Sequence, residues 1–147
     1  MKRFAAYFLY TLLLAAVVCA CSDRLDIIQN YDFDLQTLPV PKTVTQNETV
    51  EIRCQLVKQG NYIDTRYFIR YFQPDGAGEL RLDNGTLLTP NDLFPLTKDV
   101  FRLYFTAFTT GQQTIDIYIV DSTGQVVQKT FAFSGNTDTG QSDNTNT

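Results

Sequence analysis

Apolar and polar residues alternate along most of the chain after residue 30, which is the pattern of β-strands with one buried face. The first such stretch alternates Tyr31, Phe33 and Leu35 with two aspartates, and the prolines that follow end it because proline cannot donate a ladder hydrogen bond. In the next stretch, TVEIRCQL, four residues share the inward face: Val50, Ile52, Cys54 and Leu56. The outward positions of this stretch are Glu51, Arg53 and Gln55. Two half-buried strands are therefore predicted.

Turn signals divide the rest of the chain into further strands. A strand over residues 65–72 ends at the Pro74-Asp75-Gly76 turn signal, and a hairpin is expected around Asn84-Gly85. Residues 88–99 show no period and predict an irregular connection. Two later strands place alternate residues inward: Phe101, Leu103 and Phe105 on one, and Ile115, Ile117 and Ile119 on the other. A turn over residues 121–124 joins the second of these to a last strand.

About seven strands with turns between them predict an all-β, immunoglobulin-like β-sandwich, and a small β-barrel is the alternative. The chain has no tryptophan, and it lacks the inter-sheet disulfide of antibody domains. The fold prediction therefore depends on the spacing of the strands alone.

The first residues have the composition of a bacterial lipoprotein signal. Lys2 and Arg3 precede an apolar stretch of about 15 residues, which is shorter than the roughly 20 that a spanning helix needs. The stretch ends in VCAC, which resembles a lipobox with Cys21 as the acylated residue, while an ordinary secreted protein and a retained helix are the alternatives. The sequence divides into a signal peptide (1–20), a lipidated N-terminus and tether (21–30), a sandwich domain (31–134) and a disordered polar tail (135–147).

Charge and cysteine content limit what the mature chain can bind and form. Removal of Lys2 and Arg3 takes the 12 basic residues to ten against 16 acidic ones, so the net charge is near −6. Such a surface disfavours direct nucleic-acid binding, which depends on clustered lysine and arginine. Acylation of Cys21 leaves Cys54 as the one thiol, so an intramolecular disulfide cannot form, and we expect Cys54 to be a small core residue.

No catalytic constellation can be assembled from the sequence. Histidine is absent, which removes Ser-His and Cys-His nucleophile systems and most zinc sites. Aspartates in the turns are expected to bond the local backbone, and the oxygen-rich PDGAGE and LDNG loops lack the spacing of a calcium-binding EF-hand. We therefore expect a protein that is not an enzyme and that has no cofactor and no metal site.

Arginine and aromatic residues occupy the outward positions of the middle strands. This set comprises Arg66, Phe68, Arg70, Phe72, Arg102, Tyr104 and Tyr118. These residue types are enriched at protein–protein hot spots, so the set is a candidate partner-binding face. The alternative is cross-strand stacking and ion pairing on an ordinary solvated sheet.

The chain resembles the TraQ family, small lipoproteins of the transfer operons of Bacteroides conjugative transposons. The resemblance covers about residues 25–134, and the segments that carry it are EIRCQL, DTRYFIRYFQPDGAGELRLDNG, TPNDLFPL, FRLYFT, QQTIDIYIVDSTGQ and FAF. It implies an immunoglobulin-like sandwich and membership of a DNA-transfer gene set, and it supplies no catalytic residue.

Together these observations predict an envelope protein held by a lipid anchor, in the outer membrane because Ser22 follows the acylated cysteine. Its expected partners are other proteins of the conjugative transfer apparatus, which it would serve as a non-catalytic interaction or structural component. A carbohydrate- or small-ligand-binding surface lipoprotein is the alternative.

Overall fold

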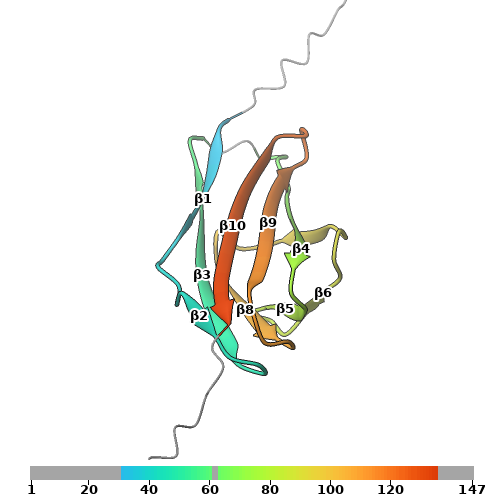
Figure 1. The fold of residues 1–147 in the computed structure, drawn as a ribbon. Coiled ribbons are helices and arrows are strands. Elements are labelled where there is room, and N and C mark those ends of the chain that lie inside the picture. Colours follow the sequence, from blue (N-terminus) through green and yellow to red (C-terminus); the bar gives the residue numbers. More distant parts are fainter. Residues whose placement is uncertain (1–30, 61–62, 136–147) are drawn as a thin grey trace, which may run out of the picture.

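Ten strands form two stacked sheets in the computed structural model, which describes residues 31–60 and 63–135 (Figure 1). Sheet 1 has the order β1 (Phe33–Thr37), β3 (Thr49–Lys58), β8 (Val100–Ala107), β5 (Gly78–Leu82) and β6 (Leu87–Leu88). Sheet 2 has the order β2 (Thr43–Val44), β10 (Val126–Gly135), β9 (Gln113–Asp121), β4 (Tyr67–Asp75) and β7 (Phe94–Leu96). Seven of these strands have five residues or more. The all-β sandwich is confirmed, and the alternative of a barrel is wrong because the described strands form two separate sheets.

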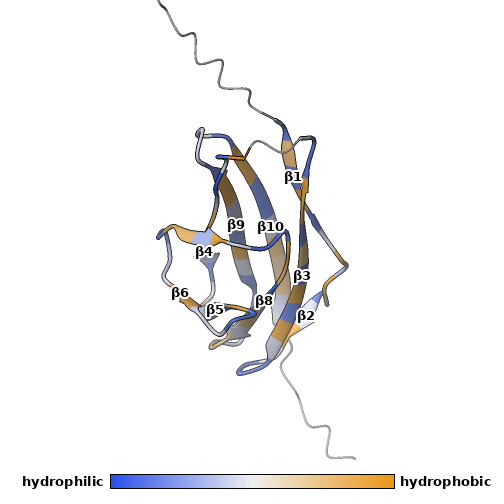
Figure 2. Ribbon diagram, turned by 180° about the vertical axis from the view of Figure 1, so that it is seen from behind, coloured by the Kyte–Doolittle hydropathy of each residue, from blue (hydrophilic) through white to orange (hydrophobic). Residues whose placement is uncertain are grey.

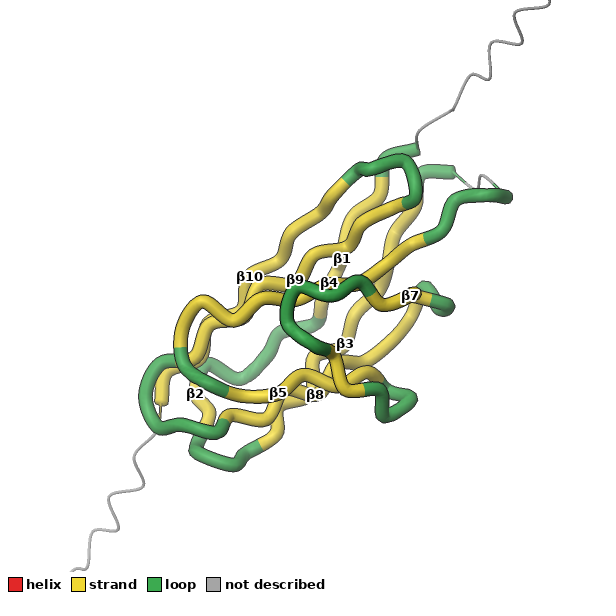
Figure 3. Tube along the Cα trace, turned by 90° about the vertical axis from the view of Figure 1, so that its right-hand side faces the viewer, coloured by secondary structure: helices red, strands yellow, loops and turns green. Residues whose placement is uncertain are grey.

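Neighbouring strands are antiparallel in both sheets, apart from β2 and β10, which pair in parallel. No helix occurs among the described residues, which are strands and loops throughout (Figure 3). This part of the chain accordingly contains no helix that could cross a membrane.

The alternation seen in the sequence becomes the inward and outward faces of the strands. In β9, Ile115, Ile117 and Ile119 are fully buried, and each residue between them is half-buried. Figure 2 shows the same alternation as hydrophobic and hydrophilic bands along β9 and β10. The inward residues of β3 and β8 are also buried as predicted, so both sheets supply one face to a shared core.

Two aromatic pairs join the sheets across this core. Phe105 of sheet 1 stacks on Phe133 of sheet 2 with ring centroids 5.7 Å apart. Phe33 of sheet 1 meets Tyr67 of sheet 2 edge to face at 5.1 Å. Such pairs contribute about 0.5–1.5 kcal/mol each beyond the burial of their area. They are part of the larger buried cluster that joins the two sheets.

The turns are largely where the sequence predicts them. Gly85 adopts a φ of 85° in the β5–β6 hairpin, and the amide of Leu82 donates to the carbonyl of Thr86 at 2.9 Å. Strand β4 continues past its predicted end at Phe72, through Pro74 to Asp75. An irregularity in register between Phe72 and Asp75 admits the proline, because a residue in a bulge needs no ladder hydrogen bond.

The prediction that residues 88–99 are irregular is wrong in one part. Phe94–Leu96 form the short strand β7, in which Phe94 pairs with Ile69 of β4 (Figure 3). Three residues are too few to show a period, and Pro95 at their centre argues against a strand. Proline is tolerated here because β7 is the edge of sheet 2 and its outer side needs no partner.

Candidate functional site

The outer face of sheet 2 brings together five of the seven residues predicted to bind a partner. These five, which we call the sheet 2 patch, are Arg66, Phe68, Arg70, Phe72 and Tyr118. Alternation along β4 turns its even-numbered residues outward, while Tyr67, Ile69 and Tyr71 are buried. Arg66 precedes β4 and is exposed, and its backbone is bonded to Ser122 at 2.8 and 3.1 Å. The patch therefore stands on a paired and fixed backbone.

Arg70 is the centre of the patch. It lies directly opposite Tyr118 in the ladder, with its guanidinium carbon 5.0 Å from the centroid of the tyrosine ring. Its Nε is buried and donates no hydrogen bond within the described part of the chain. Among residues 31–60 and 63–135, no carboxylate lies within ion-pair distance of Arg66 or Arg70. Two positive charges are thus presented beside aromatic rings without an ion-pair partner in the described part of the chain.

An apolar row borders the patch and extends it across three strands. Phe68 of β4 pairs with Val120 of β9, which in turn pairs with Val126 of β10. Val126 is 52% exposed, and Phe72, in the patch itself, is 42% exposed. The valines were not among the predicted site residues. Val120 could have been predicted from the sequence, because it follows Tyr118 by two positions and therefore shares its outward face.

A cleft of about 370 Å³ opens at the end of the patch, beside Arg66 and Phe68. Pro95 and Leu96 of β7 form its apolar wall, and Lys58 contributes a charge. Lys58 is paired with Asp99 at 2.7 Å and lies 5.1 Å from the centroid of the Tyr67 ring. The face is therefore not uniformly flat, and the patch ends in a recess that could take a side chain of a partner.

The two remaining predicted residues, Arg102 and Tyr104, are not part of this face. They belong to β8 and point outward from sheet 1, on the opposite side of the sandwich. The prediction of one face containing all seven residues is therefore wrong. Alternation separates inward from outward positions, but it does not say to which sheet a strand belongs.

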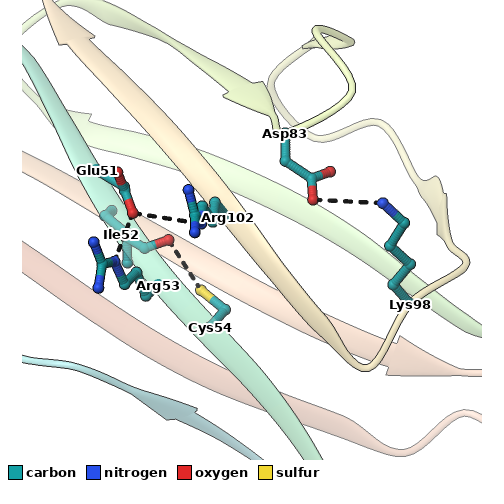
Figure 4. Close-up of polar contacts among 7 residues, drawn as sticks. All are labelled: Glu51, Ile52, Arg53, Cys54, Asp83, Lys98 and Arg102. Carbon is teal, nitrogen blue, oxygen red and sulfur yellow. Dashed lines mark hydrogen bonds and ion pairs between the residues drawn. The ribbon is translucent and has the colours of Figure 1, made fainter.

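Arg102 takes part instead in a charged cluster on the outer face of sheet 1 (Figure 4). The carboxylate of Glu51 lies between two arginines, 2.6 Å from Nε of Arg53 and 3.5 Å from Nε of Arg102. The hydrogen bond from Arg53, together with the positive charge of both guanidiniums, lowers the pKa of Glu51. The hydroxyl of Tyr104 and the charge of Glu51 raise the pKa of Arg102.

Cys54 is a core residue, as the alternation in β3 predicts. Its side chain is buried, and its thiol lies 3.7 Å from the carbonyl oxygen of Ile52 (Figure 4). Burial raises the pKa of this thiol to about 12, so the reactive thiolate is not formed at neutral pH. A nucleophilic or redox role for Cys54 in the folded protein is thereby disfavoured.

One aspartate of the turns, Asp121, bonds the local backbone. Asp121 is buried and accepts hydrogen bonds from the backbone amides of Thr123 and Gln125, at 2.9 and 2.8 Å. This is the backbone-bonding role expected for an aspartate in a turn. In the described part of the chain, no group of three or more acidic or cysteine side chains could hold a metal ion.

Several predictions fall on residues outside the described ranges. These are the signal peptide (1–20), the acylated Cys21 with its tether (21–30), and nearly all of the polar tail (135–147).

Fold and surface together define the class of protein: an all-β sandwich of two five-stranded sheets whose outer faces carry arginines and aromatic rings. The chain belongs to the TraQ conjugal transfer protein family, whose profile matches residues 4–136. The resemblance on which the sequence prediction depended is therefore confirmed.

Three solved structures are similar to the chain over most of its length. A lipoprotein from Bacteroides thetaiotaomicron is 54% identical, with 78% of this chain and 88% of that chain covered and a TM-score of 0.67. A conjugative transposon lipoprotein from Bacteroides eggerthii is 39% identical, with 71% and 98% covered and a TM-score of 0.67. A conjugate transposon protein from Bacteroides vulgatus is 43% identical, with 80% and 95% covered and a TM-score of 0.65. No curated protein sequence is significantly similar to the chain.

Proposed function

We propose that this protein is a lipid-anchored, non-catalytic interaction component of the mating apparatus of a conjugative transposon, and that it binds another protein of that apparatus through the sheet 2 patch. The family is a conjugal transfer family, and two of the similar structures are described as belonging to conjugative transposons. The expected partner is a protein, because the acidic net charge of the chain opposes direct contact with the transferred DNA.

The proposed anchor is an acylated Cys21. Two of the similar proteins are described as lipoproteins, and the sequence ahead of Cys21 has the composition of a lipobox. Two or more acyl chains are needed for stable attachment, and a bacterial lipoprotein carries three. The outer membrane is the expected location because the residue after Cys21 is serine. The described domain would then stand off the membrane at the end where β1 begins.

The strand order also supports the proposed immunoglobulin-like class. In constant-type immunoglobulin domains, one sheet has the order A, B, E, D, and the other contains C, F and G. Numbering the longer strands of this chain from A gives the same partition, with β1, β3, β8 and β5 in one sheet and β10, β9 and β4 in the other. In this correspondence the patch lies on the sheet that contains C, F and G.

The single observation that carries the proposal is the uncompensated arginine pair of the sheet 2 patch. Arg66 and Arg70 stand beside three aromatic rings on a chain with excess negative charge, and no described carboxylate pairs with either. Arginine and aromatic side chains dominate hot spots, where a loss of about 2 kcal/mol weakens binding by roughly 30-fold. Acidic groups of a partner would form ion pairs with these two arginines.

The proposal is tested in mating experiments with a donor whose chromosomal copy of the gene is deleted. The deletion should lower the transfer frequency and leave growth unchanged. Complementation with the natural gene should restore transfer, whereas Arg66→Glu/Arg70→Glu should leave it near the level of the deletion. Lys42→Glu/Lys129→Glu is the matched control, because it changes the charge by the same amount at two exposed lysines outside the patch.

The transfer frequency is compared only among variants that accumulate in the envelope at the level of the natural protein and that unfold in a cooperative thermal transition. An undiminished transfer frequency with a folded Arg66→Glu/Arg70→Glu protein would contradict binding of the partner through the sheet 2 patch. An undiminished frequency in the deletion strain would remove the role in transfer altogether.

A second candidate function, binding of a carbohydrate or small ligand, is favoured by the cleft beside Arg66 and Phe68. Aromatic rings in such a cleft can stack on sugars, although Phe68 is the one ring that lines it without being part of the core. A glycan array probed with the protein separates the two functions. Saturable binding that Phe68→Ala removes would favour the second candidate.

A further inference from the structure

A depression of about 300 Å³ lies on the outer face of sheet 1, on the other side of the sandwich from the sheet 2 patch. It forms where β1 ends and the chain leaves the sheet at Leu38, whose amide still donates to the carbonyl of Arg53 at 3.1 Å. The side chains that surround it are Gln36, Leu38, Arg53, Gln55, Val100 and Arg102. They come from three neighbouring strands and form a bowl with polar and apolar walls.

The two arginines of this depression face each other. Arg53 of β3 is the direct partner of Arg102 of β8 in the ladder, an arrangement of like charges that is destabilising without an anion. Glu51 supplies one carboxylate to both, through the Nε of each guanidinium (Figure 4). The lining itself contains no acidic side chain. Two guanidiniums thus share one carboxylate at a recess on a chain whose net charge is −4.

Both guanidiniums are available to a ligand. Their side chains are 59% and 53% exposed, and Glu51 contacts each guanidinium through Nε. The hydroxyl of Tyr104 also bonds the guanidinium of Arg102, and the remaining terminal N–H donors of both arginines can meet a further acceptor. A planar guanidinium binds a carboxylate through two parallel hydrogen bonds, and such charge-assisted bonds are about twice as strong as neutral ones. Because Glu51 already orients both arginines, less side-chain entropy is lost when a second anion binds.

The other residues that line the depression indicate which kind of molecule would supply the anionic group. Gln36 and Gln55 are opposite each other in the β1–β3 ladder, and each amide offers both a donor and an acceptor, as a peptide unit does. Leu38 and Val100 are 54% and 66% exposed and provide apolar contacts on either side. A phosphodiester group, as in a lipid headgroup, accepts hydrogen bonds only and would leave the amide oxygens and the apolar walls unused. The recess therefore suits a peptide more closely than a lipid headgroup.

We propose that the sheet 1 depression is a second binding site, which takes an acidic peptide segment of a partner protein. A glutamate or aspartate carboxylate of that segment bridges Arg53 and Arg102, its backbone bonds Gln36 and Gln55, and an adjacent apolar residue contacts Leu38 and Val100. The site does not depend on the sheet 2 patch. A protein with both sites can hold two segments at once, on opposite faces of one rigid sandwich.

The test is an NMR titration of the full-length acylated protein in neutral detergent micelles, labelled with ¹⁵N at arginine and glutamine. The probe is a capped pentapeptide of alternating leucine and glutamate, and the matched probe has glutamine in place of glutamate. The acidic probe should shift the Nε–H signals of Arg53 and Arg102 together with the side-chain amides of Gln36 and Gln55. The uncharged probe should bind about tenfold more weakly or worse, because it lacks the charge-assisted bonds.

Arg53→Gln/Arg102→Gln should reduce binding of the acidic probe about tenfold or more. Arg53→Lys/Arg102→Lys should also weaken it, because lysine keeps the charge and loses the two-pronged geometry. Lys42→Gln/Lys129→Gln is the control of equal charge and should bind as the natural protein does. Arg66→Glu/Arg70→Glu should bind the probe normally, which separates this site from the sheet 2 patch.

Three results would overturn the proposal. One is equal binding of the acidic and uncharged probes. Another is the absence of shifts at all four labelled side chains in a protein whose natural spectrum is dispersed. The third is a response of the two arginines to inorganic phosphate or to micelles containing phosphatidylglycerol, with no response to the peptide, which would identify a phosphate or lipid site.

Discussion

The substitution Arg70→Met tests whether the arginine at the centre of the sheet 2 patch stabilises the fold or binds a partner. Methionine keeps an unbranched apolar stem and removes the guanidinium. If the arginine were present for the stability of the sheet, its loss should be costly. If it is present for a partner, the folded protein alone should not need it.

The contacts of Arg70 give the expected magnitude. The guanidinium lies 5.0 Å from the centroid of the Tyr118 ring, and a cation–π contact at a partly exposed site contributes about 0.5–1 kcal/mol. Against this, its Nε is buried without a hydrogen bond to the described residues, which costs about 1–3 kcal/mol. The substitution is therefore expected to leave the free energy of unfolding unchanged or to raise it by up to about 2 kcal/mol. At about 4–8 °C per kcal/mol, Tm should rise by between 0 and about 16 °C.

The measurement is thermal and urea unfolding of the natural protein, Arg70→Met, Tyr118→Leu and the double variant. The double-mutant cycle should return a coupling of about 0.5–1 kcal/mol between the two residues, which isolates the stacking contribution. Arg81→Met serves as the reference for an exposed arginine with an ion pair, here to Glu79 at 2.8 Å, and should change stability by less than about 1 kcal/mol.

Destabilisation of more than about 1 kcal/mol by Arg70→Met would refute this reasoning, since the arginine would then be part of the structural scaffold. Unchanged or increased stability, combined with loss of transfer in the mating assay, would show that the charge is retained for binding at the expense of stability.

Three further predictions concern the scaffold. Gln113→Leu should lower the free energy of unfolding by about 2–4 kcal/mol, because the buried amide donates to the carbonyl and hydroxyl of Thr109 at 3.1 and 3.0 Å; an unchanged urea midpoint would contradict it. Cys54 should make stability fall with pH by about 1.4 kcal/mol per unit above pH 9, since the unfolded thiol ionises near 9.0 and the folded thiol near 12, so its contribution is complete below pH 9 and lost towards pH 12. The comparison is Cys54→Val, and parallel stability curves for the two proteins would exclude this linkage. Gly76→Ala should cost about 2–4 kcal/mol, more than Gly85→Ala at about 1 kcal/mol, because both glycines have positive φ but only at position 76 would the methyl group overlap the side chain of Gln113; equal losses in Tm would count against it.

The sequence predicts which residues face inward more accurately than it predicts which strands are neighbours. Alternation in β3, β8 and β9 identifies their buried residues because a strand has a period of two and one face of each sheet is covered. Strands of either sheet of a sandwich show this alternation, so it does not tell which sheet contains a given strand. Arg102 could therefore not be separated from Arg70 without knowing that β8 pairs with β3 and β5, whereas β4 pairs with β9.

Short edge strands and cross-strand contacts could not be predicted for related reasons. β2 and β7 have two and three residues, which is too few for a period. Prolines also argue against both strands, since Pro95 lies within β7 and Pro41 precedes β2 by two positions. The pairing of Arg53 with Arg102 depends on the register between strands about 50 positions apart in the chain, and a shift of one residue would have placed both side chains differently. Local sequence therefore indicated the arginines, and the fold determined which of them share a site.

Site-specific photo-crosslinking in mating donor cells tests the central claim most directly. A benzophenone amino acid replaces Phe72 in the sheet 2 patch or, as a control, Phe108 in the loop after β8, which have similar exposures of 42% and 45%. We predict a crosslink from position 72 to a protein encoded by the transfer operon, lost on adding Arg66→Glu/Arg70→Glu, and no such crosslink from position 108. Crosslinks to transfer proteins from position 108 alone, or from neither position in cells that transfer normally, would contradict the claim that this face joins the mating apparatus.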